Sequence, residues 1–331
     1  MHHCLCHDRA RNFQRHYSSF RLQSESPRNN RARYKRYALI STPRLYPCLT
    51  IIAVEHGAIS ALAVSADHTT IAGGHDSGHI FTWELNKPSQ PFLHILPLPL
   101  DQVEGRKTDG HVEGVSVIHL GFLGTRHTAL VSGDDRGMAF SHLATRGLGA
   151  VRRVVKTTRI LGRYPFDASP APRPRKPSSV LGFSVLPLGN FQQATDTMGL
   201  VALLTPNLLV IVSTTPIAHT QYKAAKPKEV ATDSALSGCL AWYPFMKAKQ
   251  ASNGSKLCLN ARLVYAWSNI LTLLELSVVE TEDNDPTRLP VLDFRPKSRF
   301  RCDEAIVAVQ WINRQVFFVD KRYIDLFLME L

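Results

Sequence analysis

The stretch "AGGHDSGHIFTWEL", residues 72–85, places two glycines, a histidine, an aspartate and a third glycine in front of an apolar run. The same glycine-aspartate-glycine spacing occurs a second time, and the six positions are Gly74, Asp76, Gly78, Gly133, Asp135 and Gly137. Glycine tolerates positive φ and aspartate hydrogen-bonds to nearby backbone. The repeated pattern therefore predicts tight β-turns between paired strands.

Two other interpretations of these loops need residues that the sequence does not supply. A phosphate-binding loop needs a following helix and a Lys-Ser or Lys-Thr pair. A calcium loop needs several oxygen ligands at alternating positions, whereas the repeated pattern supplies one aspartate. We therefore expect Gly78 and Gly137 to have positive φ, and Asp76 and Asp135 to bond turn backbone without binding a metal.

Five segments share one form, in which small or polar residues lead into β-prone apolar residues. They begin at residues 59, 115, 179, 237 and 305 and are spaced 56, 64, 58 and 68 residues apart. Two or three further strand-like runs follow each of the first four, with no convincing helix between them. This repetition predicts an all-β, WD40-like β-propeller. A pair of β-sandwiches would not require similar units at regular spacing.

The repeats count to four blades and part of a fifth, so we expect an incomplete propeller over residues 49–312. Residues 1–48 are expected to be a disordered basic tail. Residues 313–331 are expected to diverge, because the end of the chain, "FFVDKRYIDLFLMEL", has a pattern that suits a helix. The polar stretches 86–112, 164–178, 218–234, 244–260 and 280–298 are expected to be inserted surface loops.

The formal net charge of +12 is unevenly distributed along the chain. Residues 1–48 hold ten Lys or Arg and two acidic residues, and residues 152–176 hold eight basic residues and one acidic residue. The remaining chain is close to neutral, which argues against a nucleic-acid-binding face. A basic contact surface for anionic membrane or an acidic partner is expected at Arg152, Arg153, Lys156, Arg159 and Arg163. The alternative is that these side chains are simply solvated.

The cysteines and the amino terminus give no sign of a metal site or of secretion. The six cysteines form no CxxC pair, which indicates a reducing compartment. His2, His3, Cys4, Cys6 and His7 lack a second ligand pair, so they predict adventitious metal binding at most. The tail has no secretory apolar core, while its arginine content leaves a mitochondrial presequence as an alternative to disorder. We expect no cofactor.

The sequence contains none of the common catalytic motifs. It has no Gly-x-Ser-x-Gly, no His-Glu-x-x-His and no phosphate-binding loop. The histidines are spread over expected turns and strands, and the four tryptophans lie in expected strands, so both are predicted to be structural. We therefore expect a non-catalytic protein that works through surface contacts on rigid blades.

Two long segments carry a resemblance to a known family. They are "HGAISALAVSADHTTIAGGHDSGHIFTWEL" (56–85) and "GFLGTRHTALVSGDDRGMAFSHLATRGLGAVRR" (121–153), and weaker similarity continues to "DEAIVAVQW" (303–311). They resemble the amino-terminal propeller of the vacuolar protein sorting-associated protein eight family, the large subunit of the CORVET endosomal tethering complex. Members continue into an α-solenoid and a RING-type zinc domain that this chain lacks, so a fragment or an altered gene product is expected.

The resemblance implies a function in vesicle-mediated transport and endosome-to-vacuole protein sorting. It implies binding to a GTP-loaded Rab GTPase of the early endosome and to other CORVET or class C tethering subunits. The protein would then be cytoplasmic and peripheral on early or late endosomal or vacuolar membranes. An incomplete propeller would bind the Rab more weakly or not at all. A generic WD40-like interaction scaffold unrelated to tethering is the alternative.

Overall fold

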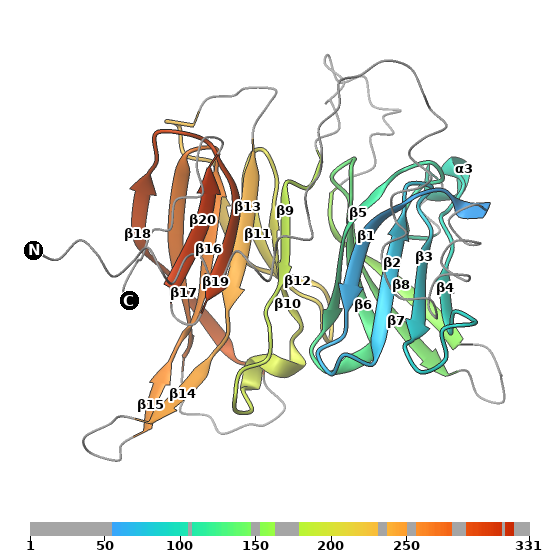
Figure 1. Ribbon diagram of the computed structural model, residues 1–331, viewed down its shortest axis with the longest axis horizontal. Helices are drawn as coiled ribbons and strands as arrows, with labels where there is room; N and C mark the ends of the chain where they lie inside the picture. The colour runs from blue at the N-terminus through green and yellow to red at the C-terminus, as the bar shows by residue number, and fades with distance from the viewer. Residues whose placement is uncertain are drawn as a thin grey trace, which may run out of the picture. The chain divides into compact units, whose positions relative to one another are not determined.

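The computed structural model of the chain describes residues 55–104, 108–146, 153–162, 179–230, 237–249, 256–279, 289–312 and 315–320. The expected basic tail, with its histidines and cysteines, lies outside these residues. Apart from a few short helical turns, the regular structure is β-sheet (Figure 1). The sheets are antiparallel and follow one another along the chain.

Three four-stranded sheets are built from consecutive strands, and we call them blades 1 to 3. Blade 1 comprises β1 (Ile59–Val64), β2 (Thr70–His75), β3 (Ile80–Glu84) and β4 (Leu93–Ile95). Blade 2 comprises β5 (Val117–Leu123), β6 (Arg126–Asp134), β7 (Ala139–Arg146) and β8 (Arg153–Leu161). Blade 3 comprises β9 (Gly182–Val185), β10 (Leu200–Leu204), β11 (Leu208–Ser213) and β12 (His219–Ala225).

Blade 4 has the same four-stranded order with a hairpin inserted after its first strand. It comprises β13 (Gly238–Tyr243), β16 (Ala261–Trp267), β17 (Ile270–Val279) and β18 (Val291–Arg301), and the hairpin is β14 (Met246–Lys249) with β15 (Lys256–Leu259). A half blade follows, made of β19 (Ile306–Ile312) and β20 (Gln315–Asp320). The short helices are α3 (Leu100–Glu104) and the 3-10 turn η2 (Ala194–Thr197).

The expected propeller with four blades and part of a fifth is confirmed. The five similar segments of the sequence become the first strands of the five units, namely β1, β5, β9, β13 and β19. The runs that follow them form the central strands, which are the most apolar. All five residues of β10 are buried, as are five of the six in β11.

The hydrophobic core lies between blades rather than inside one of them. One cluster joins blades 1 and 2 around Ile80 and Leu130, and another joins blades 2 and 3 around Val131 and Leu203. The largest joins blades 3 and 4, and the last joins blade 4 to the half blade. Each sheet therefore buries its faces against its neighbours in chain order, as expected for repeats that cannot form a core alone.

The structure corrects the expected loops and the expected carboxy-terminal end. Strands β4, β12, β14, β15 and part of β18 lie within the stretches that were interpreted as loops. The expected helix is wrong where it overlaps Gln315–Asp320, because β20 pairs with β19 there, while residues 321–331 lie outside the described part. Val316 and Phe318 are buried, so they supply the apolar side of a strand.

Candidate functional site

The repeated loops are hairpin turns, and their glycines have the backbone conformation that the sequence predicts. Gly78 has a φ of 93° and Gly137 a φ of 82°. The backbone N–H of Gly78 donates to the carbonyl oxygen of His75, and that of Gly137 donates to the carbonyl oxygen of Asp134. The two turns are therefore equivalent, and in each the glycine occupies a conformation that other residues reach at a cost.

The aspartate that holds the blade 2 turn is not the expected one. Among the described residues, none donates a hydrogen bond to the side chain of Asp76 or Asp135, and both residues are exposed. Asp134 performs this role, because its Oδ1 accepts from the backbone N–H of Arg136 at 3.0 Å and of Met138 at 2.8 Å. The sequence analysis had assigned this role to Asp135, but the neighbouring buried residue Asp134 performs it.

Asp134 also belongs to a buried network of side-chain hydrogen bonds that connects several strands of blade 2. Its Oδ2 lies 3.0 Å from Nδ1 of His111, whose Nε2 lies 2.7 Å from the hydroxyl of Ser132. That hydroxyl lies 2.8 Å from Nε2 of His142, and Nδ1 of His142 lies 3.0 Å from the hydroxyl of Thr157. Burial, with a contribution from His111, lowers the pKa of His142 to about 3. The imidazole is therefore neutral at physiological pH.

This network has the connectivity of a Ser-His-Asp catalytic triad, but not its accessibility. Ser132, His111 and Asp134 have at most 2% of their surface exposed. The Ser132 hydroxyl is also engaged on its other side by His142. No substrate can reach such a hydroxyl without opening the blade. The network therefore ties the segment before β5 to strands β6, β7 and β8, as buried polar groups with satisfied partners do.

Blade 1 has the same turn but not the same side-chain network. His75 occupies the position of Asp134, Gly73 that of Ser132, and Trp83 that of His142. Nδ1 of His75 lies 3.1 Å from the carbonyl oxygen of Gly57, while its Nε2 and Nε1 of Trp83 are buried without a partner among the described residues. A Cβ on Gly73 would lie 3.3 Å from the Trp83 ring. Glycine here makes room for tryptophan.

Blade 1 also gathers histidines that the sequence had suggested were scattered. The ring centroids of His56 and His79 are 4.5 Å apart, and those of His79 and His94 are 5.3 Å apart. Phe81 stacks on His94 at 4.0 Å. Burial and the neighbouring imidazoles lower the pKa of His79, and they lower that of His94 to about 4. The sequence signal was the recurrence of histidines at positions 75, 79 and 94, and only the strand pairing shows that their side chains come together.

The expected basic contact surface lies on β8, the outer strand of blade 2. Arg152 and Arg163 lie outside the described residues, as does the side chain of Arg153. Lys156 and Arg159 are exposed. Asp109 faces Arg159, since its Oδ1 lies 4.0 Å from the Arg159 Nε and its Oδ2 accepts from the Arg159 backbone N–H at 3.1 Å. The positive charge of the described strand is therefore partly compensated.

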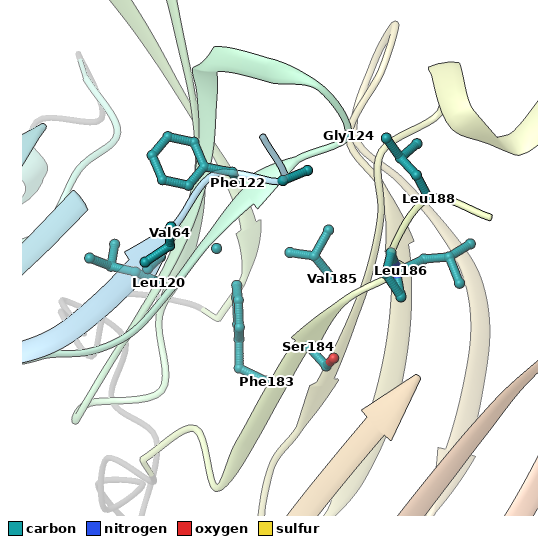
Figure 2. Close-up of a pocket in the computed structure, with 13 residues that line it drawn as sticks. Val64, Leu120, Phe122, Gly124, Phe183, Ser184, Val185, Leu186 and Leu188 are labelled. Atoms are coloured by element: carbon teal, nitrogen blue, oxygen red, sulfur yellow. The ribbon is translucent and has the colours of Figure 1, made fainter. Parts of the chain in front are cut away.

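A pocket of about 400 Å³ lies where the first strands of blades 1, 2 and 3 approach one another. Figure 2 shows Phe122 of β5 and Phe183 and Val185 of β9 around this space, with Val64 of β1 beside them. Ser184 contributes the one polar side chain of the lining. With no acid, base or cation beside that hydroxyl, the pocket can accept an apolar group but offers no catalytic set.

The described residues supply no candidate metal centre or membrane-spanning helix. No group of three or more His, Cys, Asp or Glu in this part of the chain has a geometry that could hold a metal ion. Cys239, Cys258 and Cys302 are free thiols, and burial raises the pKa of Cys239 to about 12. No described helix is long and apolar enough to cross a membrane.

Comparison with known proteins identifies the family of this architecture. Residues 44–329 match the family model described as the Vps8 β-propeller. The match begins before and ends after the range expected from the sequence, so the carboxy-terminal residues do not depart from the family at 312. No curated protein matches. Among solved structures, the β-propeller domain of Cps50 (Swd1) from Myceliophteria thermophila is similar, with 10% identity, a TM-score of 0.46 and coverage of 80% of this chain and 67% of that chain.

Proposed function

This chain belongs to the Vps8 β-propeller family, and we propose that it is the non-catalytic propeller of a membrane-tethering subunit that binds a GTP-loaded Rab GTPase of the early endosome. The observation that carries the proposal is the family match over residues 44–329. It is the same family that residues 56–85 and 121–153 resemble. The function would be vesicle-mediated transport and endosome-to-vacuole protein sorting within the CORVET complex.

The chemistry of the described residues supports a function by surface contact. The arrangement that most resembles a catalytic one, around Ser132, is buried within blade 2. The pocket beside Phe122 is lined by apolar side chains apart from Ser184. Rigid sheets that present loops and outer strands are a common platform for partner recognition. We infer that the partners include other class C tethering subunits and that the protein is peripheral on endosomal or vacuolar membranes.

The outer strand β8 is our candidate for a secondary contact with anionic membrane. Each basic residue near such a surface contributes about 1 kcal/mol of attraction. Lys156 forms no ion pair among the described residues, whereas Arg159 is held beside Asp109. Replacing Arg152, Arg153, Lys156 and Arg159 by Glu should weaken recruitment to endosomes. A stably folded variant with unchanged recruitment would assign these side chains to solvent and leave the tethering proposal intact.

A nucleotide-dependent pull-down tests the Rab proposal. The intact propeller of the tethering subunit, with all of its blades, is immobilised and exposed to early-endosomal Rab GTPases loaded with GTP or with GDP. Retention of one of them in the GTP form alone is the expected result, because an effector reads the switch loops that the γ-phosphate orders. Retention of both forms to the same extent would point to the generic interaction scaffold instead. Cosedimentation with liposomes separates any membrane contact from Rab binding.

A further inference from the structure

A second cavity, of about 310 Å³, lies between blades 3 and 4 and is unrelated to the loops and to β8. One wall is Tyr222 and its neighbours on β12, and the other is the stretch 296–299 of β18. The floor is formed by Tyr265 and Trp267 of β16 with Thr272 of β17. We call this cavity the blade 3–4 cleft.

The floor of the blade 3–4 cleft is aromatic and carries hydroxyl groups. Trp267 is held in place because its Nε1 donates to the carbonyl oxygen of Thr205 at 2.8 Å. Tyr265 is hydrogen-bonded to Thr272, and burial raises its pKa to about 12. Burial also raises the pKa of Tyr222, whose ring stacks on Phe294 with centroids 5.1 Å apart. Both phenols therefore remain protonated and can donate hydrogen bonds at neutral pH.

The charges along β18 leave one cation available at the cleft. Arg295 is paired with Asp293 at 2.6 Å, and Lys297 is paired with Glu275 at 2.8 Å. Arg299 and Arg301 are exposed, and neither forms an ion pair among the described residues. Of these two, Arg299 lines the cleft and Arg301 does not. The cleft thus presents a guanidinium at its wall above an aromatic floor.

Protection of the sheet edge accounts for only part of this arrangement. β18 is the outer strand of blade 4. It contains Pro296 and several basic side chains, and its pairing with β17 has a bulge between Leu273 and Leu274. These features discourage pairing with another strand. Edge protection explains cations that project into solvent. It does not explain a concave site in which a guanidinium and two tyrosines face the same space.

We propose that the blade 3–4 cleft binds an acidic peptide segment of a partner protein, with an apolar side chain on the aromatic floor and a neighbouring carboxylate on Arg299. Arginine favours carboxylates because its planar group donates two parallel hydrogen bonds. Aromatic residues with arginine are the side chains that most often dominate binding at interfaces. A membrane surface fits less well, because the site is recessed between two blades. The proposal does not depend on Rab binding.

The test uses the intact chain and a pair of labelled peptides. In the first twelve-residue peptide, Asp and Glu flank Leu and Phe, and in the second, Asn and Gln replace the acids. Fluorescence anisotropy measures binding to the unmodified chain and to the variants Arg299→Glu and Arg301→Glu. These two variants make the same change of charge on the same strand, and only the first alters the cleft. Thermal melting confirms that both variants are folded.

The expected result is saturable binding of the acidic peptide, with at least about tenfold weaker binding of the neutral peptide. Arg299→Glu should weaken binding of the acidic peptide at least about tenfold, and Arg301→Glu less than about threefold. Tyr222→Phe should weaken it severalfold by removing a hydroxyl. Equal losses in the two arginine variants would indicate diffuse attraction and overturn the proposal. Absence of saturable binding, or Arg299-dependent binding to phosphatidylserine vesicles without peptide binding, would overturn it as well.

Discussion

Blades 1 and 2 contain the same turn, yet they stabilise it in different ways. In both, the residue before the turn donates its N–H to a carbonyl oxygen four residues later at 2.9 Å, from His75 to His79 and from Asp134 to Met138. Blade 2 adds a buried polar network around Asp134, whereas blade 1 replaces it with packing of Trp83 over Gly73. The backbone and the glycine define the turn, and the side chains around it can be exchanged.

The largest difference between the two blades should appear when the residue before the turn is made apolar. Asp134→Leu removes an acceptor shared by His111 and two backbone N–H groups, and we expect it to lower the free energy of unfolding by about 3 kcal/mol or more. His75→Leu removes one hydrogen bond and a buried nitrogen without a partner, so it should cost about 1 kcal/mol.

Urea unfolding followed by tryptophan fluorescence compares these two variants under the same conditions. Similar slopes of the unfolding curves would confirm that both variants reach comparable folded and unfolded states. Equal losses of stability in Asp134→Leu and His75→Leu would contradict the distinction between the blades.

The network of blade 2 should also make the fold sensitive to acid. His142 resists protonation in the folded state until pH falls to about 3, whereas the unfolded chain takes up this proton near the ordinary pKa of 6.5. The unfolded state therefore binds more protons between these values. Stability is complete above about pH 6.5 and is lost as pH falls, with a slope of up to about 1.4 kcal/mol per pH unit for this group.

His142→Gln should reduce this slope, because glutamine retains a donor and an acceptor but does not titrate. In blade 1 the pKa values of His79 and His94 are also lowered, so these imidazoles would leave a residual slope of the same sign. His68→Asn is the matched control, since His68 is exposed and asparagine tolerates its positive φ of 58°. Stability curves from pH 4 to 8 would refute this explanation if the two variants had the same slope.

The smallest expected effect concerns the turn glycines, where the two blades should behave alike. Gly78→Val and Gly137→Val should each cost about 1 kcal/mol or more, because valine disfavours positive φ. At Gly78 a Cβ would also lie 3.0 Å from the backbone oxygen of Val112. Thermal melting of the two variants measures both losses of stability. Unchanged melting temperatures would mean that the turns can adopt another conformation.

The sequence predicted the inner strands of the blades and missed several outer ones, and the reason is burial. β10 and β11 are apolar along nearly their whole length, so their residues alone indicate buried strands. β12 and β18 contain no buried residue and are rich in polar side chains. They are strands because the neighbouring strand supplies backbone hydrogen bonds, and no local periodicity records that pairing.

The candidate site was predicted less completely than the fold. The glycine spacing located both turns, but it aligned Asp76 with Asp135 and so directed attention away from Asp134. The partner of Asp134 is His111, which is 23 residues away in the sequence. Their contact depends on how the segment before β5 returns to the turn. Similarly, Arg299 and Tyr222 face one cleft only because blades 3 and 4 pack together.

Titration calorimetry with a purified early-endosomal Rab GTPase tests the central claim most directly. The intact propeller of the tethering subunit, with all of its blades, is titrated with the Rab loaded with a non-hydrolysable GTP analogue and, separately, with GDP. The proposed effector function predicts at least about tenfold tighter binding of the GTP form, which corresponds to about 1.4 kcal/mol. Equal affinity for the two nucleotide states would contradict it, whatever the affinity itself.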